Sequence, residues 1–394
     1  MKLREKPTKM LNCDFILVLV VTFLYGLNMN LINPITAQYA SSFGADETMM
    51  GIAVGVFSIT ALLVRPVTGP LANSGNNNKM LMLAFFVYAS SSFGYILFSN
   101  IYNLLLMRFI HGFGVSLCSA LLPTMACEYV PENKIGSAIG YFSLAQTIAM
   151  AVGPSITLKV SERFGFSGSF ILAGIVATIA FFTVFALSKQ QISKKKIKFS
   201  ISDMVAKEAV FPTILHTIGA AVYSLISSFL VIYAVSVRGI NNETIGWYFT
   251  TYAIALIATR PLLSFLEMKV KDIYVIAVGS IISLISMVIL SVAESMLLFI
   301  ISSVLMAFGF GIVMPVLQTL SVKLVSRENR ATANSTFNAG MDIGMGLGPV
   351  IGGVVASKLG YANMFFVFSF IEIPAVILAV IFRKKLLYKK YEAL

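Results

Sequence analysis

Residues 272–292 read DIYVIAVGSIISLISMVILSV, an apolar run in which Asp272 is the one charged residue. A run of about 20 such residues is long enough to cross the hydrocarbon core of a bilayer. Because backbone N–H and C=O groups find no water there, the segment must satisfy its own hydrogen bonds and is expected to be a helix. Runs of this kind recur along the chain, so the sequence predicts an all-α membrane protein.

The recurring runs predict twelve transmembrane helices in two sets of six. The first set is expected at residues 12–36, 47–71, 79–98, 101–126, 136–160 and 166–188. The second set is expected at residues 208–235, 244–266, 272–292, 296–322, 331–356 and 362–384. The longest polar connection, which begins at Lys189, separates the two sets. We therefore predict an N-terminal six-helix half (1–188), a cytoplasmic linker (189–207) and a C-terminal six-helix half (208–394).

The composition excludes a soluble globular protein. The 394 residues are 58% hydrophobic and only 12% charged, with a mean hydropathy of +0.87. A soluble protein carries about 25% charged residues, because its surface must be wet. The first apolar run continues past Tyr25 to Pro34, which is too long for the apolar part of a signal peptide, so we expect an uncleaved first span.

The 29 Lys and Arg residues predict the orientation of the chain. If both termini are cytoplasmic, the outer loops hold Lys159, Arg163, Arg238 and Lys358, and three arginines lie in spans. The remaining basic residues then all face the cytoplasm, which agrees with the positive-inside rule. An anionic inner leaflet therefore accounts for the net charge of +12, and no nucleic-acid partner is expected.

Internal repetition appears when the chain is shifted by 195 residues. The shift places Gly44 on Gly239, Gly51 on Gly246, Arg65-Pro66 on Arg260-Pro261, and Gly153-Pro154 on Gly348-Pro349. These matches occupy equivalent positions in the two sets of spans, so we predict a duplicated unit and two pseudo-symmetric halves. Parallel repeats with a site near the bilayer midplane are a plan used by transporters.

Three motifs carry a resemblance to a known family. They are Gly69-Pro-Leu-Ala-Asn73 after the second span, Arg108-Phe-Ile-His111-Gly112-Phe-Gly114 in the fourth span, and Gly153-Pro154 in the fifth with Gly348-Pro349 in the eleventh. With the twelve spans, the repeat and the linker, the whole chain resembles the major facilitator superfamily. Within it, the chain is most similar to the twelve-span bacterial drug:proton antiporter-like exporters. The resemblance implies a monomeric transporter in a bacterial plasma membrane.

The loop after the second span is similar to the family's cytoplasmic gate motif, G-x-L-a-D-r-x-G-r-r. Asn73 replaces the acidic residue of the motif, and Asn76–Asn78 replace most of its basic cluster. The resemblance implies a gate, to which we assign Arg65, Gly69, Asn73, Glu128 and Arg260. A helix end followed by a polar turn would also produce such a loop.

The motif in the fourth span resembles the family pattern R-x-x-q-G-x-G, with His111 in place of glutamine. An arginine about 10 Å deep in a span is costly unless it is paired or hydrated. The resemblance implies that Arg108 takes part in proton transfer, and His111 shares its helix face at i+3. The alternative is that Arg108 extends outward to the interface and His111 packs.

The glycine-proline motif of antiporter-type exporters has the pattern g-x8-G-x3-G-P-x2-G-G. Its parts here are Gly153 and Pro154, and the repeat partners Gly348 and Pro349. Small residues at this spacing allow close approach of helices, and proline kinks a span. The resemblance implies proton-driven export, although close packing alone would explain the pattern.

Acidic residues inside spans are candidates for proton coupling, because burying a charge in a membrane is expensive. Asp342, near the middle of the eleventh span, is the first candidate, and Glu372 in the twelfth is the second. Each could instead form a structural ion pair with an arginine. We therefore assign proton coupling to Asp342, Arg108, His111 and Glu372.

Polar and aromatic residues in the spans are candidates for substrate binding. We assign this role to Tyr25, Asn28, Asn30, Asn33, Gln146, Tyr223, Tyr248, Tyr252, Gln318 and Asn338. The first span is unusually polar, and in the family this span lines the cavity. The charged residues inside the spans are mostly basic, which favours a neutral, zwitterionic or anionic solute over a lipophilic cation.

The sequence therefore predicts a secondary transporter that exports a small organic molecule in exchange for protons. It shows no nucleotide-binding loop, metal cluster or catalytic triad, so we expect neither an enzyme nor a cofactor. One alternative is a proton symporter or facilitator that imports a polar metabolite. Another is a membrane receptor or sensor that uses a transporter scaffold without transport.

Overall fold

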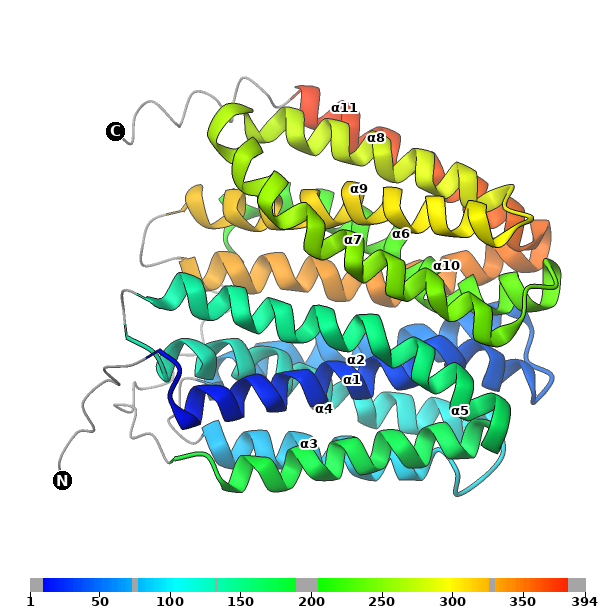
Figure 1. Ribbon diagram of the computed structural model, residues 1–394, viewed down its shortest axis with the longest axis horizontal. Helices are drawn as coiled ribbons and strands as arrows, with labels where there is room; N and C mark the ends of the chain where they lie inside the picture. Colours follow the sequence, from blue (N-terminus) through cyan, green and yellow to red (C-terminus); the bar gives the residue numbers. More distant parts are fainter. Residues whose placement is uncertain (1–9, 73–76, 132–133, 189–204, 326–329, 382–394) are drawn as a thin grey trace. The chain divides into compact units, whose positions relative to one another are not determined.

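The computed structural model describes residues 10–72, 77–131, 134–188, 205–325 and 330–381 (Figure 1). The described residues of the N-terminal half form α1 (Cys13–Ser41), α2 (Glu47–Ala72), α3 (Asn77–Gly94), α4 (Ile101–Glu128) and α5 (Ile135–Phe185). Those of the C-terminal half form α6 (Val210–Ile232), α7 (Asn242–Lys269), α8 (Asp272–Ser291), α9 (Met296–Lys323), α10 (Arg330–Ser369) and α11 (Glu372–Ile381). A 3-10 turn (Lys207–Ala209) precedes α6, and a π-helical turn (Tyr233–Val237) follows it.

The helices confirm the predicted spans. Among the described residues, eight helical stretches are long and apolar enough to cross a membrane. Two of these, residues 137–185 and 332–377, are 49 and 46 residues long, about twice the length that a bilayer needs. Each is interrupted by a glycine with positive φ, so each supplies two spans. With α3 and α7, the twelve predicted spans all coincide with helices.

The interruptions lie at Gly165 in α5 and Gly360 in α10, with φ of 69° and 81°. The other positive-φ residues in the described chain are Gly44 and Gly239, with φ of 76° and 66°. Only glycine adopts this region freely, because a Cβ would crowd the backbone. The four residues form two pairs, each separated by the predicted repeat distance of 195, so the repeated unit conserves its sharp turns.

The helix starts follow the same repeat. α2 and α7 begin at Glu47 and Asn242, and α3 and α8 begin at Asn77 and Asp272. The starts of α4 and α9, and of α5 and α10, are separated by the same distance. The shift of 195 residues therefore superimposes secondary structure as well as sequence, which is expected of two copies of one six-helix unit.

The chain divides into two compact units. The first consists of residues 1–45 and 56–199, and the second of residues 46–55 and 200–394. In the first unit α1 packs along α5, and in the second α10 packs along α6. Residues 46–55, the first turns of α2, belong to the second unit by their contacts, and Gly51 lies against the backbone of Pro349 there.

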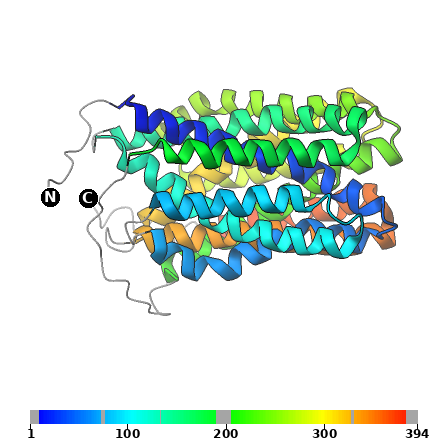
Figure 2. The same ribbon diagram turned by 90° about the horizontal axis from the view of Figure 1, so that it is seen from below.

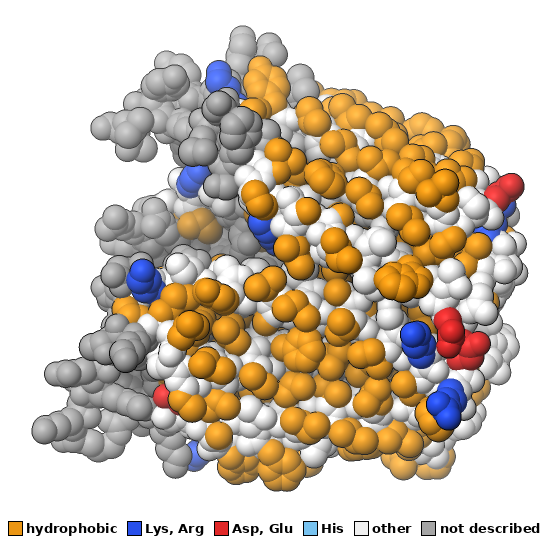
Figure 3. Space-filling model, viewed as in Figure 1, with side chains coloured by type: hydrophobic (Ala, Val, Ile, Leu, Met, Phe, Trp, Pro, Cys, Tyr) orange, Lys and Arg blue, Asp and Glu red, His pale blue; other side chains and the backbone are white. Residues whose placement is uncertain are grey.

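Apolar side chains cover much of the surface. Leu63, Phe86, Phe182 and Trp247 are examples of large apolar residues that are exposed. Figure 3 shows hydrophobic side chains spread over the middle of one face, while Lys, Arg, Asp and Glu lie toward its ends. A soluble protein rarely exposes so many large apolar side chains, so lipid is the expected neighbour of these residues.

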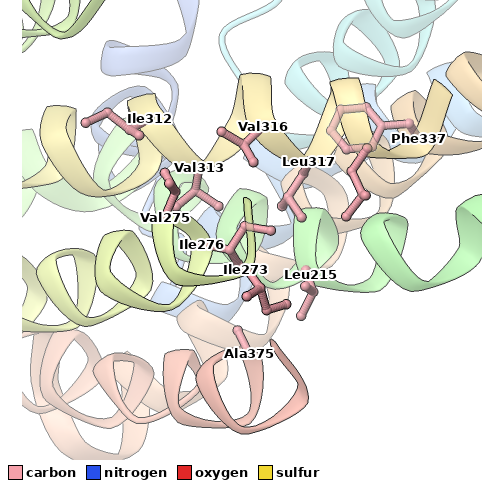
Figure 4. Packing of buried hydrophobic residues seen from close by; sticks show 11 residues of the cluster. Leu215, Ile273, Val275, Ile276, Ile312, Val313, Val316, Leu317, Phe337 and Ala375 are labelled. Carbon is pink, nitrogen blue, oxygen red and sulfur yellow. The ribbon is translucent and has the colours of Figure 1, made fainter. Parts of the chain in front are cut away.

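In the first unit, α3 packs against α4 and α5 (Figure 2). In the second unit, α9 and α11 pack against α8 (Figure 1). A core cluster fills the space among α6, α8, α9, α10 and α11, and Figure 4 shows its packing. Its fully or almost fully buried members include Ile276 of α8 and Val316 and Leu317 of α9. Leu215, Ile276 and Val313 of this cluster also line a small cavity beside Glu372.

Candidate functional site

Arg108 is the largest fully buried side chain of the first unit, with 0% of its surface exposed. It projects from α4, and its Nη1 donates a hydrogen bond of 3.1 Å to Oδ1 of Asn33 on α1. The guanidinium carbon lies 4.2 Å from the centre of the Phe57 ring, a cation–π contact. The alternative that Arg108 extends outward to the interface is therefore wrong.

His111 lies one turn further along the same face of α4 and is also fully buried. Its Nδ1 is 3.4 Å from the hydroxyl of Ser91, and its Nε2 is 3.5 Å from the sulfur of Met29. Its ring packs on Tyr88 at a centroid distance of 4.4 Å. Arg108 and His111 are thus both buried among polar and aromatic side chains of the first unit.

The polar face of α1 is largely occupied by contacts within the first unit. Asn28 donates to the hydroxyl of Ser92 at 3.2 Å and to the carbonyl of Ala173 at 2.8 Å, which ties α1 to α3 and α5. Asn30 donates to the carbonyl of Gly26 in its own helix at 2.8 Å. The three asparagines thus have different partners. Asn28 links α1 to α3 and α5, Asn30 bonds within α1, and Asn33 accepts the hydrogen bond of Arg108.

The other predicted residues of the first unit lie close to these contacts. Tyr25 meets Tyr88 edge to face at 5.7 Å. Gln146 is half-buried on α5, where its backbone lies beside Gly26. A Cβ on Gly153 would lie 2.6 Å from Cβ of Asn30, so the residue before Pro154 permits the close approach of α1 and α5.

Asp342 is buried in α10 of the second unit, with 9% of its surface exposed. Its neighbours Gly340 and Gly344 lie against α6, where a Cβ on either would lie within 3 Å of Thr213 or of Ala220. Asn338, one turn before Asp342, is half-buried. The carboxyl is thus held in a helix that packs closely on its neighbour.

Glu372 is the first residue of α11 and is 3% exposed. Its Oε1 accepts a hydrogen bond of 3.2 Å from Ser283 of α8. Among the described residues, no arginine or lysine pairs with this carboxyl.

Aromatic residues of α6, α7 and α9 form a stack in the second unit. Tyr223 and Phe310 are parallel, with centroids 4.9 Å apart and planes within 6°. Tyr252 lies 5.7 Å from Tyr223, and Tyr248 is buried on the same helix. Tyr223 thus lies between Tyr252 and Phe310, and the sequence analysis missed Phe310.

Gln318, at the far end of α9, lies apart from this stack. Its Nε2 donates to Oδ1 of Asn334 at 3.0 Å, and the pair is exposed. Gly348 lies on α10 near the middle of the span, where a Cβ would lie 2.8 Å from the carbonyl of Ala221. With Pro349 next to it inside the helix, this is a packing contact of α6 with α10, the repeat counterpart of Gly153 and α1.

The predicted gate residues are only partly described. Nδ2 of Asn77 at the start of α3 donates to Oε2 of Glu128 at 3.4 Å, which joins α3 to the end of α4. Arg65 is half-buried and Arg260 is exposed. Gly69 lies within α2. Asn73 lies outside the described residues, so the role of the modified motif remains a prediction.

The sequence analysis missed the serine hydroxyls that lie near Glu372. Ser283 and Ser280 carry the hydroxyls beside Glu372, and nothing in their local sequence distinguishes them from the other serines of α8. His216 stacks on Phe337 at 3.9 Å and contacts its carbonyl through Nδ1 at 3.0 Å, which is a packing arrangement. Among the described residues, no three His, Cys, Asp or Glu side chains gather to hold a metal ion.

Known proteins with similar sequences are membrane transporters, in agreement with the fold. The chain matches the Major Facilitator Superfamily profile over residues 18–241 and 213–390. An uncharacterised MFS-type transporter of Methanocaldococcus jannaschii is 24% identical, over 88% of this chain and 92% of that protein. A homologue of the multi-drug resistance efflux pump PmrA from Lactococcus lactis is 23% identical, over 78% of this chain and 79% of that protein.

Solved structures show the same fold at lower identity. A bacterial homologue of the human lysosomal transporter Spinster has a TM-score of 0.80 at 13% identity, and covers 97% of this chain and 98% of its own. The nucleoside transporter NupG has a TM-score of 0.75 at 13% identity, and covers 95% of this chain and 99% of its own. Since the family profile spans nearly the whole chain, this protein belongs to the major facilitator superfamily and is a multi-pass membrane transporter.

Proposed function

We propose that this transporter exports a small organic molecule in exchange for protons. The observation that carries the proposal is the burial of ionisable side chains in both units, with Arg108 at 0%, Glu372 at 3% and Asp342 at 9% exposure. Burying such groups in a span is expensive, and in transporters they mark ion or substrate pathways. A fold held together by apolar packing alone would not need them.

Asp342 is the proton carrier in this proposal. Its carboxyl is buried in α10, a helix that packs closely on α6, and a carboxyl can hold or release one proton as its surroundings change. Arg108 and His111 contribute a fixed positive charge and a second titratable group in the first unit. Alternating access of the two units to the two sides of the membrane would then couple proton entry to substrate exit.

The export direction is supported by the relatives. Matches include the multi-drug resistance efflux pump PmrA of Streptococcus pneumoniae, at 26% identity over 61% of this chain and 58% of that protein. The staphylopine export protein of Staphylococcus aureus is 24% identical, over 62% of this chain and 64% of that protein. Import is the second candidate, because the fold shared with transporters such as NupG does not fix the direction of transport.

Flux in oriented proteoliposomes tests direction and coupling together. The purified protein is reconstituted with a pH-sensitive dye inside, and neutral, anionic, zwitterionic and amine-bearing solutes are loaded on one side in turn. Exchange predicts that a solute leaving the vesicle drives protons in the opposite direction. Movement of the solute and protons in the same direction would replace the proposal with a symporter, and solute movement without protons would replace it with a facilitator.

A further inference from the structure

A small cavity lies among α6, α8, α9 and α11 of the second unit. Its volume of about 10 Å³ corresponds to room for about one water molecule. Three polar side chains line it, Ser280 and Ser283 from α8 and Glu372 from α11, and the rest of its wall is apolar or glycine. Leu215, Ile276 and Val313 of that wall belong to the core cluster of Figure 4, so the polar groups stand at the edge of a dry core.

Glu372 stands at a break in its span. The helix is interrupted at residues 370–371, and Glu372 is the first residue of the ten-residue helix α11. Burying a carboxylate is expensive unless it is hydrogen-bonded and paired with an opposite charge. Ser283 adds a hydrogen bond of 3.2 Å to the carboxyl, and in the described part of the unit no basic side chain pairs with it. The carboxylate is thus buried with little more than hydroxyl partners, and a positively charged ligand would supply the charge that compensates it.

The repeat shows that this polar group is not required by packing. A shift of 195 residues relates Ser280, Ser283 and Glu372 to Phe85, Tyr88 and Ala177 of the first unit. There the two rings lie 6.0 Å apart and are fully buried, as is Ala177. The glycine counterparts agree, since Gly114 faces Tyr88 and Gly309 faces Ser283. One copy of the unit therefore fills this place with aromatic rings, and the other holds a carboxyl, two hydroxyls and a cavity.

The number and type of polar side chains around the cavity indicate which kind of ligand it can bind. Hard metal cations in proteins gather about six or more oxygen ligands, whereas three oxygen-bearing side chains line this cavity. A primary ammonium group is close in size to one water and has three N–H donors, which match the carboxylate and the two hydroxyl oxygens. We propose that Glu372, Ser280 and Ser283 form a subsite for a primary ammonium group of the transported molecule. This inference rests on the proposed function.

The apolar wall supplies the place for the rest of such a molecule. Phe310 and Met314 of α9 line the cavity and are half-buried, so this side of the cavity reaches the surface of the unit. Gly219 of α6 lies opposite, where a Cβ would come 3.3 Å from Met314 Cε and from Phe310. Methionine is flexible enough to move aside for an alkyl stem. Phe310 also stacks on Tyr223, and aromatic rings at this wall would attract a cation through cation–π contacts.

Binding of simple amines to the purified full-length protein tests the subsite without any transport. n-Butylammonium is titrated at constant ionic strength, and thermal stability and saturation-transfer NMR report binding. Tetramethylammonium and sodium serve as cations without N–H donors. The expected result is that butylammonium binds and stabilises the wild type, and that Glu372→Gln weakens binding about ten-fold or more. Glu294→Gln is the matched control, because it removes an exposed charge in the same unit, and it should bind normally.

If Glu372→Gln does not fold, the double variant Ser280→Ala/Ser283→Ala tests the inference instead. It retains the charge of Glu372 and should weaken butylammonium binding several-fold. The inference is overturned if butylammonium does not bind, if it binds the variants as well as the wild type, or if tetramethylammonium or sodium binds equally well. Each of these results leaves proton exchange untouched, since no gradient is present. Loss of exchange in vesicles with intact amine binding would instead contradict the proposed function alone.

Discussion

The guanidinium of Arg108 on α4 and the amide oxygen of Asn33 on α1 are joined by a hydrogen bond of 3.1 Å between fully or partly buried groups. The bond fixes a charge that no solvent reaches, since Arg108 is completely buried. Asn33 is therefore best understood as the residue that positions this arginine. The same contact links two helices that the family resemblance connects with the substrate cavity and with proton transfer.

Asn33→Ala should impair transport by leaving a charge-assisted donor of Arg108 without its acceptor. Removing one partner of a buried hydrogen bond to a charged group costs about 1.5–3 kcal/mol. We expect a matching loss of thermal stability and a fall in solute exchange of about ten-fold or more. Asn363→Ala is the control, because that exposed amide only bonds to its own helix at Leu359. Equal behaviour of the two variants would show that Asn33 does not position Arg108.

Gly309→Ala should loosen the contact of α8 with α9. A Cβ at this position would lie 2.7 Å from the backbone nitrogen of Ser283 and 2.8 Å from the carbonyl of Gly279, neither of which can move alone. Forcing extra volume into a packed interior costs about 1–3 kcal/mol. The melting temperature in detergent should fall accordingly, whereas Gly140→Ala, with no atom within 4 Å of its Cβ, should be neutral. A neutral Gly309→Ala would mean that this helix pair is not tightly packed.

Gly165→Ala and Gly360→Ala should destabilise the protein by similar amounts. Both glycines combine positive φ with ψ of 179° and 162°, and both have open space around a Cβ, so the penalty is conformational and amounts to about 1–3 kcal/mol. Denaturation of the two single variants and the double variant measures it. Because the sites lie in different units, the two effects should add. A large difference between the two would argue against equivalent turns in the two copies.

Tyr233→Phe should weaken the end of the second unit that follows α6. The phenol accepts a hydrogen bond of 2.9 Å from Arg238 and donates to the carbonyl of Leu290 or Ser291 at about 3 Å. Removing it leaves buried groups unsatisfied, at about 1–3 kcal/mol. Glu294→Gln breaks the ion pair of 3.5 Å with the same arginine, but that carboxyl is 80% exposed, so no measurable change is expected. A larger loss of thermal stability in Glu294→Gln than in Tyr233→Phe would contradict this account.

The sequence predicted the spans and the repeat well, because both depend on local properties. Apolar run length fixes where helices can cross a bilayer, and the shift of 195 residues that aligns Gly153 with Gly348 also aligns the helix starts. The sequence even held the signal for the two sharp turns, since Gly165 and Gly360 are separated by the same distance. The sequence analysis missed this signal because it treated the two turns as ordinary loops between predicted spans.

The surroundings of the candidate site could be predicted only in part. The depth of Arg108 in a span indicated a functional role but left open whether the side chain is buried, and its contacts with Asn33 and Phe57 join residues far apart in the chain. The hydroxyls beside Glu372 come from another helix, and no periodicity distinguishes Ser283 from Ser286. Side-chain partners across helices depend on rotation and crossing of the helices, which hydrophobic patterning leaves undetermined.

Solute-driven proton flux in proteoliposomes, measured for the wild type, Asp342→Asn and Glu294→Gln, tests the central claim most directly. The amide keeps the size of the buried side chain in α10 but cannot carry a proton, and the control removes an exposed carboxylate from the same unit. We predict that solute drives protons in the opposite direction in the wild type and in Glu294→Gln, and that Asp342→Asn abolishes proton movement. Normal coupling in Asp342→Asn, or solute transport by the wild type with no proton movement, would contradict the claim.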